Sequence, residues 1–435
     1  MFENVIWREE NNFTLRAIKT DRFKMSRLSF NFILPADREK SPLCKLMLAV
    51  LMRGSKKYPS VVEINKALDE FYGATVTWRS NSVGGRHIFR ISCEMLNNRY
   101  RLAGDDRNIL HGVAEIVLNI LTEPLLDENG LLLAQNIESE RKIAIDALMA
   151  KINDQKAYSA DQCRKYMLGD DISGVSSEGT IEQIEKFTAE ELTDNVSYFL
   201  ENAVLECYYV GEEDAEEIAD IIDGALARVK RGSKVISLSE KAFVSERDSV
   251  QEIDEKMDVS QGRLNIGCLC GTVMVDDTYY AMNLFNEIFG GSSVARLFTY
   301  VREKQSLCYY CYSAYHSANG TIMINCGIKK ENRDRALDEI KRQLCMMQNG
   351  EFSDEEIATA KKTIISGMRQ INDSPSALEA FSFRRLLAGV GENLTEAAEK
   401  ISSVTREEII AAARKVKIDT VYFLSGDGEE EEDYE

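Results

Sequence analysis

The chain has 435 residues, of which 44% are hydrophobic and 29% charged, with a formal net charge of −19. The composition is that of an ordinary globular protein, and the length fits two domains of roughly 200 residues better than a single core. The acidic balance argues against a phosphate-backbone partner, so we expect no binding to nucleic acid. No apolar run approaches the roughly 18–20 residues of a membrane span, and the first residues lack the pattern of a secretory signal. We therefore expect a cytoplasmic protein that does not contact a membrane.

The first half predicts a strand, two helices, two strands, long helices and a last strand. Residues 30–34 read as a strand, and Ser41-Pro42 is expected to begin a helix, with serine as the N-cap and proline in the first turn. Apolar residues of 109–121 recur at helical spacing. Thr188 opens a Thr-x-x-Glu capping box, which marks a helix start. An aromatic-rich strand at 207–211 closes this half.

The second half repeats this order. It opens with a strand at 264–268, has helical spacing at 357–368, and reaches a second capping box at Thr405 and a strand at 422–426. Three short segments match between the halves in the same order: 91–93 with 324–326, 149–154 with 368–373, and 187–192 with 404–409.

This repetition predicts an α+β fold made of two homologous domains, each a mostly antiparallel sheet packed on helices. The expected domains are residues 1–232 and 263–428. A charged linker is expected at 233–262 and an acidic tail at 429–435.

The most specific pattern lies in the second half. Gly-Gly-Ser-Ser-Val-Ala-Arg-Leu-Phe at 290–298 precedes Val-Arg-Glu-Lys-Gln-Ser-Leu-Cys-Tyr at 301–309. This pattern resembles the C-terminal domain of the pitrilysin/insulinase peptidase family, in which a Gly-rich turn, Arg-Leu-Phe and an Arg-Glu-Lys-x-x-Leu-x-Tyr run recur. The resemblance extends over nearly the whole chain and implies two pitrilysin-like domains. Within the family the chain is similar to the paired bacterial insulinase-like proteins named for elongation factor P aminopentanol modification.

Active members of this family carry a His-x-x-Glu-His motif on the first long helix of the N-terminal half. The two imidazoles hold one Zn²⁺, and the glutamate acts as base on the bound water. When Gly54-Ser55 is aligned with the family's Gly-Thr, Lys45 and Ala49 stand at the histidine positions and Leu48 at the position of the base. A lysine ammonium has no free lone pair at neutral pH, and the other two side chains offer no donor.

The further glutamate ligand of the family is also missing. The later helix matches over 138–147, which leaves Ala147 at the ligand position, although a shift of one residue would bring in Asp146. The accessory acid Glu140 remains, and one carboxylate does not rebuild the site. We therefore expect no metal, no cofactor and no catalytic residue, so that the chain is not an enzyme.

Other candidate sites are weaker. The three histidines (His87, His111 and His316) show no metal-ligand spacing and are expected to be packing or surface residues. The turn at 290–293 lacks the Gly-Lys-Thr/Ser of a phosphate loop.

The ten cysteines are expected to be reduced thiols. Cys308 and Cys311 form a Cys-x-x-Cys, with Cys268 and Cys270 upstream, so a zinc or redox site is conceivable. However, residues 308–312 read as a strand, in which side chains three apart point to opposite faces. We therefore expect Cys308 and Cys311 not to converge.

The resemblance implies one retained functional pair, Arg302 and Tyr309, as substrate-binding residues. In active relatives this pair faces the zinc across the chamber, grips the peptide and helps stabilise the charged intermediate. A guanidinium and a phenol can both donate to a developing oxyanion. The alternative is that Arg302 is a surface ion-pairing residue and Tyr309 a buried strand aromatic.

The metal-binding half is therefore missing while the substrate-gripping half is present. In this family's heterodimers one chain brings zinc and the other faces it without a working metal motif, so the resemblance implies a non-catalytic subunit. Its expected partners are a zinc-bearing pitrilysin-family homologue and a peptide or unfolded protein segment. Two alternatives remain: a structural homologue that binds no peptide, as in respiratory-complex core subunits, and a stand-alone peptidase with a relocated site.

Overall fold

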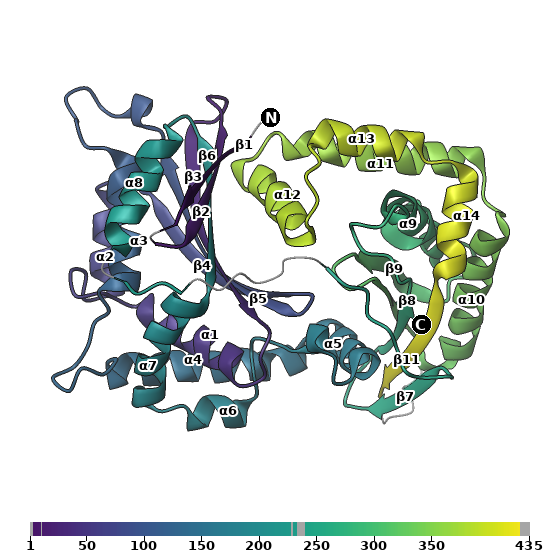
Figure 1. The fold of residues 1–435 in the computed structure, drawn as a ribbon. Helices are drawn as coiled ribbons and strands as arrows, with labels where there is room; N and C mark the ends of the chain where they lie inside the picture. Colours follow the sequence, from purple (N-terminus) through teal and green to yellow (C-terminus); the bar gives the residue numbers. More distant parts are fainter. Residues whose placement is uncertain (1–2, 10, 228, 233–239, 427–435) are drawn as a thin grey trace, which may run out of the picture. The chain divides into compact units, whose positions relative to one another are not determined.

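The structure is a computed structural model of the chain, and it describes residues 3–9, 11–227, 229–232 and 240–426. These residues form two compact units, each with its own sheet (Figure 1). Unit 1 contains residues 1–149, 175–237 and 371–383, and unit 2 contains residues 150–174, 238–370 and 384–435. Each unit thus includes a segment from the opposite half of the sequence.

Unit 1 contains a six-stranded sheet in the order β1-β2-β6-β3-β5-β4. Its strands are β1 (Glu3–Arg8), β2 (Phe13–Lys19), β3 (Met25–Pro35), β4 (Thr75–Val83), β5 (Arg86–Leu96) and β6 (Val204–Gly211). Its helices are α1 (Lys40–Leu51), α2 (Val61–Asp69), α3 (Ile109–Thr122), most of α4 (Ala134–Asn153), α6 (Ile181–Lys186), α7 (Ala189–Asn202) and α8 (Ala215–Leu226). All pairs are antiparallel except β2 with β6.

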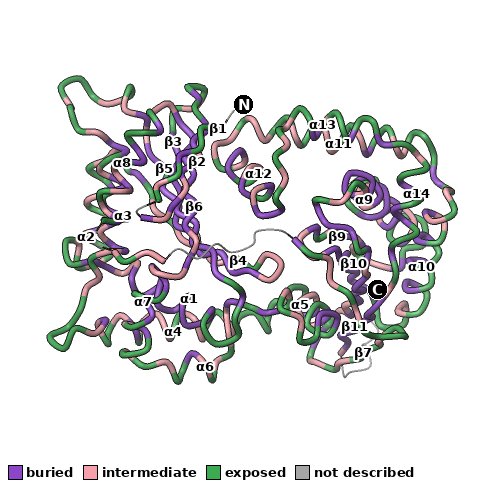
Figure 2. The backbone as a smooth tube through the Cα atoms, viewed as in Figure 1, coloured by how far each residue is buried: buried purple, intermediate pink, exposed green. Residues whose placement is uncertain are grey.

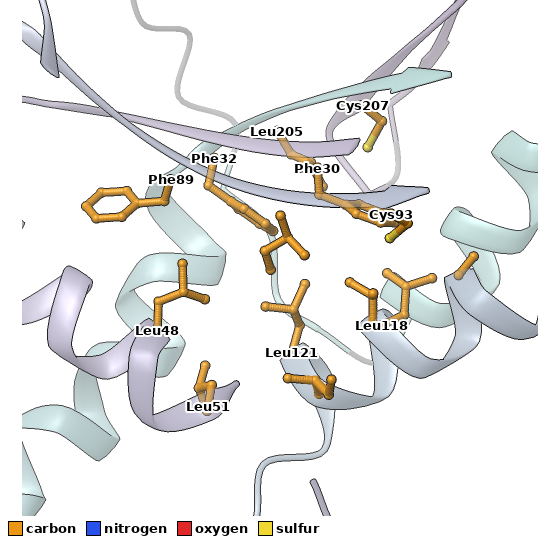
Figure 3. Packing of buried hydrophobic residues seen from close by; sticks show 14 of the residues in the cluster. Phe30, Phe32, Leu48, Leu51, Phe89, Cys93, Leu118, Leu121, Leu205 and Cys207 are labelled. Atoms are coloured by element: carbon orange, nitrogen blue, oxygen red, sulfur yellow. The ribbon is translucent and has the colours of Figure 1, made fainter. Parts of the chain in front are cut away.

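The core of unit 1 lies between this sheet and its helices. Alternate residues of β3 point to opposite faces, and Phe30 and Phe32 lie on the face that packs against α1 and α3. Figure 3 shows the aromatic rings and Leu205 of the sheet facing leucines of these helices (Leu48, Leu51, Leu118 and Leu121). Nearly every residue of α1 is buried, so this helix is core rather than a polar site helix.

Unit 2 contains a five-stranded sheet in the order β7-β11-β8-β10-β9. Its strands are β7 (Gln251–Lys256), β8 (Gly262–Leu269), β9 (Cys308–His316), β10 (Thr321–Ile328) and β11 (Lys417–Ser425). Its helices are α5 (Gln155–Leu168), α9 (Tyr279–Asn286), α10 (Arg333–Asn349), α11 (Asp354–Ile371), the end of α12 (Pro375–Ala388), α13 (Leu394–Ser403) and α14 (Arg406–Lys415). Two π-helical segments, η3 (Glu287–Gly291) and η4 (Leu297–Lys304), follow α9. The inner strands of both sheets are largely buried, whereas the edge strands β4, β7 and β9 are mostly half-buried or exposed (Figure 2).

The two units confirm the predicted α+β fold class and its duplication. The central strands β3 and β8 each have two antiparallel neighbours, and β2 and β7 each run parallel to the last strand of their half. Thr188 and Thr405 both form complete capping boxes, as the sequence predicts. Strands β1 and β2 were not predicted.

Helix α5 belongs to unit 2 although it lies in the first half of the sequence. Its Cys163 and Met167 pack with Met323 and Tyr422 of the second sheet. The approach is close, because a Cβ on Gly267 would meet the Met167 sulfur at 2.6 Å. Residue 267 is therefore a glycine because any larger side chain would clash with Met167 of α5.

Conversely, the beginning of α12 belongs to unit 1. Glu379 is fully buried there, accepting a hydrogen bond from Ser29 at 2.6 Å and pairing with Arg27 and, at 3.4 Å, Arg90. The Phe383 ring packs edge-on against Tyr208, with centroids 5.7 Å apart. These contacts use the sheet face opposite Phe30 and Phe32.

The segments expected as linker and tail are only partly described. Strand β7 lies within 233–262, the segment expected as a linker. It is an edge strand in which exposed charged residues alternate with half-buried ones, and this pattern made the segment resemble a charged linker. The part 233–239 and the expected tail 429–435 lie outside the described residues. Helix α1 begins at Lys40 rather than at Ser41, and the Asp37 carboxylate accepts hydrogen bonds from the amides of Glu39 and Lys40.

Candidate functional site

A pocket in unit 1 lies at the position of the missing metal site. It has a volume of about 170 Å³. Its lining includes Lys45 and Ala49 of α1 together with Glu140 and Ala147 of α4, four of the five positions that correspond to the active site of the family; Leu48 is not among the lining residues. Most of the remaining lining is apolar: Pro42, Leu46, Trp78, Ile143, Ala144, Leu148 and Ile184.

The polar groups of this pocket are engaged in ion pairs. The Lys45 ammonium lies 3.2 Å from a carboxylate oxygen of Glu178, and the Arg53 guanidinium lies 2.8 Å from a carboxylate oxygen of Glu140. The Glu140 side chain is only 14% exposed, and its negative charge is balanced by the Arg53 guanidinium rather than by solvent. These pairs occupy the charged groups that border the pocket.

The residues at this position do not fit a zinc ion. Lys45 offers only donors, Ala49 and Ala147 offer none, and Leu48 is fully buried in the core. Asp146 is exposed and is not part of the pocket lining, so the alternative alignment by one residue gains no support. Across the described ranges, no group of three or more His, Cys, Asp or Glu side chains has an arrangement that could hold a metal.

In unit 2, Tyr309 occupies a β-bulge. On the partner strand Gly327 pairs with Tyr310 and Ile328 pairs with Cys308, which leaves Tyr309 as the extra residue of β9. A bulge re-aims a side chain locally, and Tyr309 is 56% exposed. The alternative of a buried core aromatic does not describe this tyrosine.

Arg302 lies on η4, one short turn before the bulge. Its guanidinium lies 4.6 Å from the centroid of the Phe298 ring, and its Nε lies 3.8 Å from Glu303. The side chain remains 42% exposed. The turn is fixed by backbone bonds from Ser306 to Arg302 at 2.9 Å and from Leu307 to Val301 at 3.0 Å, with Ser306 in the left-handed region at φ 53°.

The three thiols Cys308, Cys311 and Cys326 converge, contrary to the sequence-based expectation for Cys308 and Cys311. Cys311 pairs with Cys326 and Cys308 pairs with Ile328. Because Cys326 and Ile328 are two residues apart, they share one face of β10, and so do their partners on β9. The simple alternation of side chains fails here because the bulge adds Tyr309 between the two cysteines. Cys268 lies elsewhere on the sheet, opposite Ile322.

The other weak candidates have structural roles. His87 is buried, lies 2.9 Å from the Val175 carbonyl, and has a pKa lowered by burial. A Cβ on Gly290 would meet the Ser313 hydroxyl at 2.5 Å, so this glycine permits close packing between η3 and β9. Within the described residues no helix is both long and apolar enough to cross a membrane.

Comparisons with known proteins agree with the lack of a metal site in the unit 1 pocket. A family model described as the peptidase M16 inactive domain matches residues 186–364. The chain is 29% identical over 425 residues to the "Probable inactive metalloprotease YmfF" of Bacillus subtilis (strain 168), with 98% of each chain covered. This name agrees with the inactivity expected here from the missing donors.

Solved structures share the fold over the full length. A conserved protein from Enterococcus faecalis V583 has a TM-score of 0.89 at 23% identity, covering 98% of this chain and 100% of that one. A peptidase M16 inactive domain from Pseudomonas fluorescens has a TM-score of 0.79 at 17% identity, covering 99% of both chains. The chain is thus similar in sequence to peptidase M16 inactive-domain proteins, and the solved structures share its fold.

Proposed function

We propose that this chain is the non-catalytic subunit of an M16-type peptidase heterodimer, in which it grips a peptide or an unstructured protein segment opposite a zinc-bearing homologue. Members of the M16 family often pair. The paired bacterial proteins named for elongation factor P aminopentanol modification are the model for this pairing. In this role the chain supplies binding groups and the partner supplies the metal chemistry.

The observation that carries the proposal is the exposure of Tyr309 on its bulge, one turn after Arg302. A strand aromatic with a purely structural role would be buried, whereas this ring is 56% exposed. The Arg302 guanidinium is stacked on Phe298 and therefore partly preorganised. Such a pair can donate to a peptide carbonyl, or to the oxyanion formed when that carbonyl is attacked.

The degenerate pocket supports the non-catalytic part of the proposal. Its charged groups neutralise one another, Lys45 with Glu178 and Arg53 with Glu140. No general base borders it at the aligned position, because Leu48 faces the core. Hydrolysis by the complex therefore depends on the zinc of the partner.

The test is co-purification from the native cell extract, followed by peptidase assays on the isolated complex. We expect a zinc-bearing homologue to co-purify and to cleave peptides only in the mixed complex. Arg302→Ala and Tyr309→Phe should each lower kcat/KM by about 10²-fold, the usual effect of losing one oxyanion donor. Lys304→Ala is the matched control, since Lys304 lies on the same π-helical segment, is exposed, and stacks on Tyr300.

Three results would argue against this function. If the complex forms but neither variant changes its peptidase activity, the chain is a structural homologue. If no zinc-bearing homologue co-purifies, the heterodimer is ruled out. If the pure chain alone cleaves peptides in a chelator-sensitive way, it is a peptidase with a relocated site.

A further inference from the structure

Three thiols gather on one face of β9 and β10, beside the bulge. Cys311 and Cys326 are direct cross-strand partners, and the bulge brings Cys308 onto the same face. The thiols of Cys311 and Cys326 lie close enough to Cys308 to lower its pKa. All three are free thiols in this structure.

The three thiols differ in access and acidity. Cys308 is half-buried, whereas Cys311 and Cys326 are buried. Hydrogen bonds from Cys311 and Cys326 lower the pKa of Cys308, and the charge of Arg302 acts in the same direction. The hydrogen bond to Cys308 is also the main cause of the raised pKa of the other two thiols. Thus a half-buried thiol with a lowered pKa lies beside two buried thiols with raised pKa values.

This arrangement suits redox chemistry better than metal binding. The three sulfurs are not among the groups that could hold a metal, because the described residues contain no such group. A reactive cysteine needs thiolate character and access, and a redox site also needs a second thiol within reach. Cys308 has the lowered pKa and the access to solvent, and Cys311 is the second thiol within reach.

We propose that Cys308, Cys311 and Cys326 form a peroxide-sensitive thiol site, in which Cys308 is the attacking thiolate and Cys311 is the resolving thiol. Cys326 lies beside the other two on the same face of the sheet. This site is independent of the proposed peptide-gripping role, although it lies on the same strand as Tyr309.

The chemistry balances with hydrogen peroxide as the oxidant. The Cys308 thiolate attacks one peroxide oxygen, an S–O bond forms, the O–O bond breaks, and hydroxide leaves and takes up a proton. Cys311 then loses its proton and attacks the Cys308 sulfenic sulfur, so that an S–S bond forms and water departs. Two electrons pass from the two thiols to one peroxide, which yields two molecules of water.

The test uses the reduced full-length chain carrying Cys345→Ser, because Cys345 is the exposed thiol and would compete. After brief treatment with hydrogen peroxide, remaining thiols are alkylated and the linked peptides are identified by mass spectrometry. We expect a Cys308–Cys311 disulfide, with Cys308 lost at least about 10-fold faster than thiols buried elsewhere, such as Cys93 and Cys207.

Two variants separate the roles. Cys308→Ser should abolish disulfide formation, whereas Cys311→Ala should leave a Cys308 sulfenic acid that dimedone traps. Unchanged thermal unfolding of both variants verifies the fold. A disulfide confined to Cys311 and Cys326, one that joins Cys308 to Cys326, or Cys308 that reacts no faster than Cys93 would each overturn the proposal.

Discussion

At the scale of single residues, the positions that align with the metal site of active relatives carry side chains that cannot bind a metal. Lys45, Ala49 and Ala147 still line one pocket. The Lys45 ammonium is satisfied by Glu178 rather than left uncompensated. The ion pair with Glu178 therefore stabilises this pocket, and the Lys45 ammonium places a positive charge near the position that a bound zinc ion would take.

This arrangement predicts that three substitutions restore metal binding. In the variant Lys45→His, Ala49→His and Ala147→Glu, two imidazoles at i and i+4 and a carboxylate converge on the pocket, a donor set that suits Zn²⁺. We expect about one tightly held zinc ion per chain, measured by metal analysis after dialysis against a weak chelator. Leu48 is left unchanged, because a carboxylate at this core position would cost several kcal/mol, so zinc should bind without hydrolysis.

The control for this variant is an exposed histidine pair at the same spacing. Lys142→His with Asp146→His places two imidazoles on the outer side of α4, where both residues are exposed. This pair should lose its zinc during dialysis. A correctly folded triple variant that retains no more zinc than the control would show that the aligned positions do not converge as described.

Sequence predicted the loss of this site but not what replaced it. The absence of a lone pair that could bind a metal or a proton at Lys45, Leu48 and Ala49 follows directly from residue types. The partners of the remaining charges do not, because Glu178 lies 133 residues from Lys45 and Glu140 lies 87 residues from Arg53. Only the packing of the helices brings such distant residues together.

At the scale of elements, α12 is anchored to unit 1 by one buried carboxylate. We predict that Glu379→Ala lowers the free energy of unfolding of unit 1 by about 3 kcal/mol, because it removes the carboxylate partner of buried Arg90 and one of the two carboxylates paired with Arg27. Both guanidinium side chains are largely buried, at 9% and 14% exposure. Glu379→Gln should cost less, since it still offers an oxygen to Ser29.

Tryptophan fluorescence during urea unfolding measures this effect. Trp7 and Trp78 are the two tryptophans of the chain and both lie in unit 1, so the signal reports on that unit. Asp373→Ala is the control, because this acid lies in the same segment and is exposed. Equal unfolding midpoints for Glu379→Ala and Asp373→Ala would contradict the anchoring role.

Within unit 2, Tyr158 of α5 and Tyr422 of β11 share one carboxylate, that of Glu255 on β7. Tyr158 and Tyr422 donate to the two oxygens of Glu255 at 2.8 and 2.6 Å. Burial, and then the bond to Glu255, raises the pKa of Tyr158 to about 12. Since the unfolded phenol ionises near its usual value of 10.0, this contribution is complete below about pH 10 and is lost as the pH rises toward about 12.

We therefore predict an alkaline loss of stability that Tyr158→Phe reduces. The natural chain should lose stability between about pH 10 and 12, and the variant should lose less over the same range while being less stable at neutral pH by about 1 kcal/mol. Urea unfolding followed by circular dichroism across this range measures both effects. Tyr100→Phe, at a partly exposed position in unit 1, should match the natural chain. An identical alkaline slope in all three proteins would remove Tyr158 from the explanation.

The elements themselves were largely predictable, and their irregularities were not. Capping boxes at Thr188 and Thr405 and the apolar spacing of 109–121 depend on neighbours in sequence, so they could be read directly. The bulge at Tyr309 is a property of the pairing between β9 and β10, and the register of a pair cannot be read from one strand. The same omission led to the wrong expectation for Cys308 and Cys311, and it left the exposure of Tyr309 unpredicted.

At the scale of the whole molecule, each unit is completed by a segment from the other half of the sequence. Residues 150–174 belong to unit 2, and residues 371–383 belong to unit 1. The duplication explains this symmetry, because 149–154 matches 368–373 and the exchanged helices α5 and α12 follow these matched segments. The halves of the sequence are thus not the same as the folding units.

This exchange predicts that the halves are interdependent for stability. A fragment of residues 1–232 retains both tryptophans but lacks Glu379, so Arg90 loses its carboxylate partner and Arg27 keeps only Glu94. We expect its fluorescence transition at clearly lower urea than in the full chain, and a return toward the full-chain midpoint when residues 233–435 are added. The second fragment carrying Glu379→Ala should restore the midpoint less, because the returning helix no longer neutralises the guanidinium groups. If the first fragment alone unfolds at the same urea concentration as the full chain, segment 371–383 contributes nothing to unit 1, and the sheet is stable on its own helices.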